Sequence, residues 1–197
     1  FAKQGIEKTT MRQIATTAGV SPGLAYRYYS AKEQIILSWY AQNAAKLMAV
    51  IPDITERNLA ARFESLMLKK MDILRPYRTS IPAVLAAGIQ PGAEVNVFGA
   101  QSGGIRARVI DVMRAVVDGA YPRLPTDMCQ PLAEGLFFIN LGVLALWSLD
   151  ASPDQQLSLA MLRRGCNALD FAARFMKHTG LTKQMRWWID TTNAIVL

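Results

Sequence analysis

Side chains suited to binding phosphates and base edges gather in a short stretch near the N-terminus. Tyr26 and Tyr28 carry hydroxyls and Lys32 carries an ammonium, and all three groups can donate hydrogen bonds to phosphate oxygens. Gly23 leaves room for close backbone approach, and Leu24 suits contact with a thymine methyl group. These residues predict a nucleic-acid contact, whose further candidates are Thr10, Arg12, Ser21 and Pro22.

Short helices must position these side chains, and the sequence marks the first of them clearly. Thr10 and Gln13 have the spacing of a capping box, in which each side chain satisfies a backbone donor at a helix start. Gly19 can take the left-handed conformation in which helices often end. The sequence therefore predicts a helix over residues 10–18.

Two further helix starts follow at once. Ser21 as N-cap and Pro22 at the first helical position predict a second short helix over residues 22–28. Residues 30–33 read as another capping box, which would open a longer helix that ends near residue 50.

Two short helices joined by a glycine-centred turn form a helix-turn-helix. The second helix is too short to fill a core, and its predicted role is to enter a DNA major groove. Residues 1–51 hold six Lys and Arg against two Glu, whereas the rest of the chain holds sixteen against thirteen acidic residues. The basic excess is thus concentrated around these helices. The alternative is that these are ordinary surface tyrosines and lysines on a helical hairpin.

The segment GVSPGLAYRYY and the residues around it resemble a known family. Residues 19–33 resemble the DNA-binding segment of the TetR (tetracycline-repressor-like) family of bacterial transcriptional regulators, and residues 9–15 resemble the helix that precedes it. The resemblance implies that residues 22–28 form the recognition helix. It also implies that Tyr26, Tyr28 and Lys32 lie on or beside this helix and contact DNA. It also implies that residues 1–4 end an earlier helix.

The segment departs from the family at two positions. Ala25 stands where the family usually has a large aliphatic residue, so we expect a looser core beneath the recognition helix. Ala31 occupies a usual cap position, and we expect Ser30 to act as the cap instead.

Beyond residue 50 the patterns predict only helices, because there is no hairpin-turn signal and no sustained alternation of period two. The chain is therefore predicted to be all-α, with a DNA-binding domain over residues 1–50 and a larger effector-binding and dimerisation domain over residues 51–197. The helices expected in this second domain cover residues 55–74, 80–87, 105–118, 128–149 and 153–177. The sequence Ser-Pro-Asp-Gln at residues 152–155 predicts a Ser-x-x-Gln capping box at the start of the last of these helices.

The last two of these helices carry apolar residues on more than one side. A helix with one face exposed to solvent needs only one apolar stripe, which packs on the core of its own subunit. Apolar residues on more than one side therefore indicate that the helix is also buried against another subunit. The resemblance implies that the pair forms a four-helix interface in a homodimer. The alternative is that both stripes are buried within one subunit. The predicted interface residues are Leu157, Met161, Gly165, Ala168, Ala172 and Phe175.

Met and aromatic residues are frequent in the central helices. Such residues are usually plain core, but the resemblance implies an effector pocket among these helices, which would take an apolar or aromatic small molecule. The predicted apolar lining comprises Phe63, Met67, Met71, Phe98, Phe137 and Trp147. The predicted polar anchors are Glu64, Glu134 and Asn140, because they stand within apolar runs.

Other classes of function have little support in the sequence. A single histidine, and no motif for a nucleophile, a metal or a phosphate loop, argue against an enzyme, and we expect neither metal nor cofactor. Cys129 and Cys166 match no metal spacing and fit a reducing, cytoplasmic compartment. The apolar run 135–149 is shorter than the ~20 residues of a membrane span, which favours a core helix. The remaining rival is a helical protein-interaction module that does not bind DNA.

Overall fold

The computed structural model describes residue 1, residues 3–90 and 103–175, and a few positions between 184 and 194. The regular elements among these residues are all helices, which confirms the predicted all-α class. The α-helices are α1 (Met11–Thr17), α2 (Pro22–Tyr28), α3 (Lys32–Ala49), α4 (Leu59–Leu74), α5 (Ile81–Ile89), α6 (Gly103–Asp118), α7 (Thr126–Leu149) and α8 (Gln156–Phe175). Short 3-10 turns, η1 (Ile51–Asp53), η2 (Arg75–Ser80) and η4 (Pro153–Gln155), stand between some of them.

The helices α1 and α2 begin and end where the sequence predicts. The N–H of Gln13 donates to Thr10 Oγ1 at 3.3 Å, and the N–H of Thr10 donates to Gln13 Oε1 at 2.9 Å, which completes the predicted capping box. Gly19 has a φ of +69°, the left-handed conformation that turns the chain after α1. The N–H of Leu24 donates to Ser21 Oγ at 3.1 Å and caps α2.

The start of α3 differs from the prediction. Ala31 is the N-cap residue, and its side chain accepts no hydrogen bond. The predicted capping box over residues 30–33 is wrong, because the backbone N–H of Ser30 donates to Gln34 Oε1 at 3.0 Å. Ser30 stands one position too early for its hydroxyl to serve as the N-cap acceptor of this helix.

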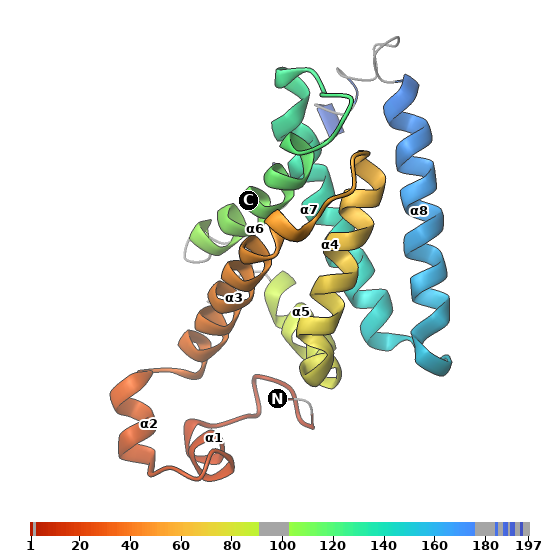
Figure 1. Ribbon diagram of the computed structural model, residues 1–197. Coiled ribbons are helices and arrows are strands. Elements are labelled where there is room, and N and C mark those ends of the chain that lie inside the picture. Colours follow the sequence, from red (N-terminus) through yellow and green to blue (C-terminus); the bar gives the residue numbers. More distant parts are fainter. Residues whose placement is uncertain are drawn as a thin grey trace.

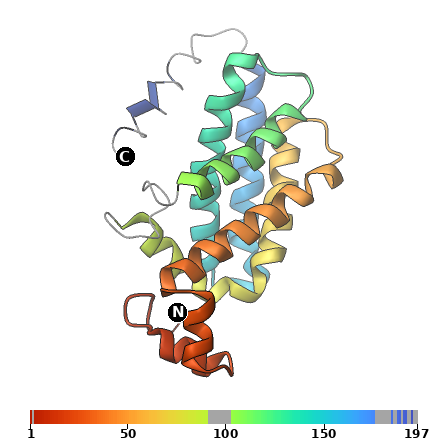
Figure 2. The same cartoon turned by 90° about the vertical axis from the view of Figure 1, so that its left-hand side faces the viewer.

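The helices α1 and α2 lie together at one end of the molecule, and α3 connects them to a larger bundle (Figures 1 and 2). Within that bundle α6 packs between α3 and α7. The helix α8 packs against α4 and α7 and forms an outer edge of the bundle (Figure 1). This arrangement places the helix-turn-helix away from the main core.

Two hydrophobic clusters hold these helices together. The main core contains Leu47 of α3 and Trp147 of α7, both about 1% exposed, and it includes the buried, free thiols of Cys129 and Cys166. A smaller cluster joins Ile6, Ile36 of α3 and Val84 of α5. The small cluster fastens the segment before α1 to the larger bundle, and it therefore links the end of the molecule that holds α1 and α2 to α5.

A buried arginine links α4 to the polypeptide around it. The guanidinium of Arg62 donates through Nε to the carbonyl of Val116 at 3.0 Å, and through Nη1 to the carbonyls of Ile54 and Glu56 at 2.9 and 3.1 Å. The residue is only 7% exposed. Gly119 leaves room for this guanidinium. A Cβ at position 119 would stand only 2.2 Å from Arg62 Nη2.

The start of α8 also departs from the prediction. A Ser-x-x-Gln capping box was expected at residues 152–155, but Asp154 and Gln155 have φ of 49° and 55°, which are not helical. Asp150 provides acceptors instead, since its carboxylate accepts from the N–H groups of Ser152 and Ser158 at 2.9 and 2.7 Å. Hydrogen bonds from Ser152 and Ser158 hold the Asp150 pKa well below its usual value. The capping box is wrong because these residues turn the chain before α8 begins.

The helix α7 is long and apolar enough to cross a membrane by length and composition alone. Core helices give the same signal, and one such helix is weak evidence of a span. Here Leu136, Leu144 and Trp147 of α7 are buried in the main core, as expected for the core helix predicted from the sequence.

Candidate DNA-binding helices and effector cavity

The helix α2 presents the predicted DNA contacts on an exposed surface. Leu24 is 40% exposed, Tyr26 56% and Tyr28 74%, and α2 has no fully buried residue. A Cβ built at Gly23 would meet no atom within 4 Å, so the backbone there is open to an approaching surface. Large side chains gathered on so short an exposed helix are typical of a surface that binds a partner.

The opposite side of α2 holds the helix on its support. Ala25 is half-buried, and no side chain of α2 is buried more deeply, in agreement with the looser core expected there. The hydroxyl of Tyr29 lies 3.4 Å from Ser38 Oγ and links the end of α2 to α3. The other predicted contacts, Thr10, Arg12, Ser21 and Pro22, are exposed around the two helices.

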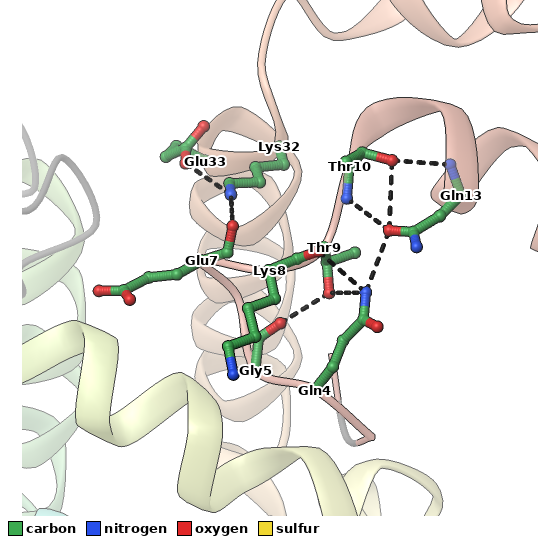
Figure 3. A network of polar contacts seen from close by, with 9 residues as sticks. All are labelled: Gln4, Gly5, Glu7, Lys8, Thr9, Thr10, Gln13, Lys32 and Glu33. Carbon is green, nitrogen blue, oxygen red and sulfur yellow. Dashed lines mark hydrogen bonds and ion pairs between the residues drawn. The ribbon is translucent and has the colours of Figure 1, made fainter.

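Lys32 is held by the protein itself, which the sequence did not reveal. Its Nζ donates to the carbonyl of Glu7 at 2.9 Å and lies 4.0 Å from Glu33 Oε1 (Figure 3). The Lys32 side chain is 21% exposed. A phosphate bound there would therefore share the ammonium with the segment that precedes α1.

The same segment is fastened to α1 by a small polar network (Figure 3). Gln4 Nε2 donates to the carbonyl of Lys8 and to Gln13 Oε1, both at 3.0 Å. Thr9 Oγ1 donates to the carbonyl of Gly5 at 2.6 Å. These bonds fasten the segment to the start of α1, and the hydrogen bond from Lys32 to Glu7 links the same segment to α3.

Comparison with known proteins points to one family of regulators. Residues 1–38 match the family described as "Bacterial regulatory proteins, tetR family". The HTH-type transcriptional regulator BetI of Rhizobium meliloti (strain 1021) is 46% identical over 44 residues. The N-terminal segment of the chain is therefore of the TetR type. The match to BetI covers 22% of this chain and 22% of that protein, so it leaves most of each chain uncompared.

Deeper in the protein, α3 to α7 surround a cavity of about 300 Å³. Helix α3 contributes Trp39, Tyr40 and Asn43, so the helix that follows α2 also forms one wall of the cavity. A volume of this order suits a small organic molecule. Most of the wall is apolar, and its side chains include Leu74, Ile81, Val84, Leu85, Ile105, Val109, Phe137 and Leu144.

Lys70 and Asn140 form a buried polar pair in the cavity wall. Lys70 Nζ donates to Asn140 Oδ1 at 2.5 Å, and the two residues are 7% and 1% exposed. Burial lowers the pKa of Lys70 to about 7, because an ammonium loses its hydration there. The lysine therefore changes charge near neutral pH.

Asn43 and Tyr40 add two further polar groups to the wall. Asn43 Nδ2 donates to the carbonyl of Trp39 at 2.8 Å, while its Oδ1 is buried and has no hydrogen-bond partner among the described residues. The hydroxyl of Tyr40 donates to the carbonyl of Val84 at 3.3 Å, and burial raises its pKa. Asn43 is thus the wall group with an unused acceptor.

The cavity differs from the predicted pocket in most of its residues. Phe137 and Asn140 line it as predicted. Phe63, Met67, Met71 and Trp147 do not line it, because they point into the main core, where each is at most 2% exposed.

The two predicted acidic anchors lie elsewhere. Glu64 Oε1 pairs with Arg163 Nε at 3.4 Å, and Glu134 Oε1 accepts from Gln130 Nε2 at 2.8 Å, both away from the cavity wall. Phe98 lies outside the described residues. The sequence did hold a signal for the missed Lys70, which shares the register of the apolar stripe of α4.

The predicted dimer surface of α8 is exposed in the single chain. Leu157 is 64% exposed and Met161 56%, and Gly165 and Ala168 are exposed as well. The predicted interface residues Ala172 and Phe175 belong to α8, but their side chains lie outside the described set. On α7, the apolar side chains of Ile139, Leu146 and Leu149 are also exposed, by 48%, 48% and 69%.

Proposed function

We propose that this chain is a transcriptional repressor that binds a pseudo-palindromic operator as a homodimer and is released by an apolar or aromatic small molecule. The observation that carries the proposal is the exposed, capped helix α2 of a TetR-type helix-turn-helix. In this proposal residues 1–50 bind DNA in the cytoplasm, and residues 51–197 bind the effector and the second subunit.

The exposed apolar side chains of α7 and α8 support the homodimer. Exposed apolar surface shared by two neighbouring helices is typical of a protein interface. A two-fold dimer would present two recognition helices separated by about 34–36 Å, or a multiple of this spacing, to successive turns of one DNA face. A pseudo-palindromic operator follows from that symmetry.

The small hydrophobic cluster supports release by an effector. Val84 belongs to this cluster and also lines the cavity, while Ile6 in the same cluster precedes α1. A molecule that moves α5 or α3 would therefore shift the support of the helix-turn-helix. Release requires that the effector bind more tightly to the arrangement that does not fit DNA.

The competing function is a helical protein-interaction module without DNA binding, which would also use an exposed α2. An electrophoretic shift with the promoter next to the protein's own gene distinguishes the two. We expect saturable binding to the promoter that persists when scrambled DNA is added in excess as a competitor. If scrambled DNA competes as well as unlabelled promoter DNA does, the proposal is contradicted.

Lys32 should contribute charge without reading sequence, because it stands at the start of α3, beyond the recognition helix. We expect Lys32→Ala to weaken binding to all DNA sequences about equally and to reduce the salt slope by roughly one unit per subunit. Lys46→Ala is the matched control, because it removes the same charge from the exposed last turn of the same helix. Fluorescence anisotropy over a salt series measures both. A change of sequence preference in Lys32→Ala would place the residue in the groove.

Leu24 and Tyr28 should instead affect which sequence is preferred. We expect Leu24→Ala or Tyr28→Ala to change the preference among operator variants by ~1–3 kcal/mol at the affected base pair. Both side chains are exposed, so neither change should lower the melting temperature. Binding to a set of single-base operator variants is the measurement. An equal loss on every variant would mean that α2 lies in another orientation.

Gly23 offers a test that leaves the fold intact. A methyl group there has open space in the protein, so Gly23→Ala should not lower the melting temperature. We expect operator affinity to fall about tenfold or more, because the added methyl meets the DNA backbone at close approach. Unchanged affinity would show that DNA does not approach this part of α2 closely.

A further inference from the structure

We propose that the cavity takes an apolar molecule that carries one carboxylate, and that Lys70 supplies the opposite charge. The inference rests on the proposed function, since it names the chemical class of the effector. Among the described residues that line the cavity, Lys70 and Arg106 are basic and none is acidic. The wall thus combines a largely apolar surface with positive charge only.

Lys70 has hydrogen-bonding capacity that its surroundings leave unused. An ammonium has three N–H donors. Among the described residues, Lys70 donates only to Asn140, and no carboxylate lies within ion-pair distance of it. A buried ammonium without a counter-charge is unfavourable, and an ionised carboxylate in the cavity would relieve that cost.

Arg106 and Asn43 extend the polar part of the site. The guanidinium of Arg106 lies 5.7 Å from the centre of the Phe137 ring, and both residues line the cavity. In this arrangement the aromatic or aliphatic part of the ligand packs against the apolar wall, while its carboxylate faces Lys70. The unused Oδ1 of Asn43 accepts a hydrogen bond from a hydroxyl or amide N–H elsewhere on the same molecule.

Binding of a carboxylate should be coupled to the uptake of a proton by Lys70. The Lys70 pKa of about 7 leaves the empty site about half protonated at pH 7, and a bound carboxylate raises that pKa. The other ionisable groups of the wall are Arg106 on α6 and Tyr40 on α3, and burial raises the pKa of Tyr40 further above neutral pH. Affinity for a carboxylate should therefore fall as the pH rises above 7.

The test compares molecules that share a body and differ in charge. The probes are 4-phenylbutanoate, 4-phenylbutan-1-ol and 4-phenylbutylamine, together with decanoate, decan-1-ol and decylamine. Calorimetric titration of the full chain at pH 7 should show that at least one carboxylate binds tenfold or more tightly than its alcohol and its amine. Titrations in two buffers of different ionisation enthalpy should show the uptake of up to about half a proton per chain for that carboxylate, and none for its alcohol.

Substitution of Lys70 should remove the preference for the acid. In Lys70→Met the carboxylate and the alcohol should bind within about twofold of each other, and the proton uptake should disappear. Lys69→Met is the matched control, because the neighbouring residue of α4 does not line the cavity. We expect Lys70→Met to melt no lower than the natural chain at pH 7, which verifies that the variant is folded.

Several results would overturn the inference. These are an amine that binds as tightly as its carboxylate, a carboxylate that binds Lys70→Met as tightly as the natural chain, or no measurable binding of either carboxylate. The same probes are then added to the operator complex. If a carboxylate binds through Lys70 but leaves operator affinity unchanged, the proposed release mechanism is wrong, whereas the proposed ligand class, an apolar molecule with one carboxylate, is supported. If a neutral molecule releases the natural chain and Lys70→Met from the operator equally well, the proposed ligand class is wrong, but the release mechanism is not.

Discussion

Arg62→Met should lower the free energy of unfolding by about 3–5 kcal/mol. The guanidinium of Arg62 satisfies three backbone carbonyls, those of Ile54, Glu56 and Val116, in an environment where only 7% of the residue is exposed. Methionine has a similar length but no N–H donor, so the carbonyls would lose their partners inside the fold. The end of α6 and the loop before α4 would lose a shared anchor.

Urea unfolding followed by circular dichroism measures the loss, at one fixed protein concentration because association shifts the apparent stability. Arg75→Met is the control, since the Arg75 side chain is 61% exposed and pairs with Asp72 on the surface. We expect that control to lose less than about 1 kcal/mol. Equal midpoints for the Arg62 and Arg75 variants would show that the buried hydrogen bonds contribute little.

Gly119 provides an independent check on the same anchor. An alanine methyl at Gly119 would stand 2.2 Å from Arg62 Nη2, and the guanidinium cannot move away without loosening its three hydrogen bonds. We therefore expect Gly119→Ala to lose about 1–3 kcal/mol, and to lose much less in a chain that already carries Arg62→Met.

The parts of the fold that local signals determine were predictable from the sequence. The capping box of Thr10 and Gln13, the turn at Gly19 and the cap at Ser21 involve neighbouring residues, and each forms as expected. The same kind of reasoning failed at residues 152–155. There the carboxylate of Asp150 takes the backbone donors, and a Ser-x-x-Gln pattern does not reveal that competitor.

The cavity was less predictable, because its walls depend on how five helices cross. Hydrophobic periodicity finds the buried side of α4 but does not tell which buried residues face another helix and which face a cavity. Phe63 and Met67 therefore looked like lining residues and belong to the main core. Lys70 and Arg62 fall on the same buried side of α4, and a charged residue in that register was the signal for a buried polar site.

The second large effect concerns the proposed dimer. Met161→Glu should convert the protein to a monomer and lower its operator affinity by about 100-fold or more. Met161 is 56% exposed in the single chain, so the substitution should leave the subunit folded. In the proposed interface, however, the two-fold symmetry would bring two copies of the new carboxylate into an apolar seam, where unpaired charges are strongly unfavourable.

Gly165→Leu tests the same proposed interface, the exposed row of Leu157, Met161 and Gly165 on α8, without introducing a charge. A Cβ at Gly165 meets no atom within 4 Å in the single chain, so a larger side chain fits the subunit, but it would hold two closely packed helices apart. Asn167→Glu is the control, because Asn167 is also exposed on α8 but points away from the row of Leu157, Met161 and Gly165. We expect this control to remain dimeric.

The affinity loss follows from the geometry of two linked recognition helices. In a dimer the second helix meets its half-site at a high effective concentration, whereas two monomers must bind independently. Sedimentation at micromolar concentration gives the state of assembly, and electrophoretic shifts on DNA with one and with two half-sites give the affinities. The monomeric variants should lose affinity on the two-site DNA and keep it on the single site. A variant that remains a dimer, or a monomer that binds the two-site DNA as tightly as the natural chain, would show that the seam on α8 does not join the DNA-binding subunits.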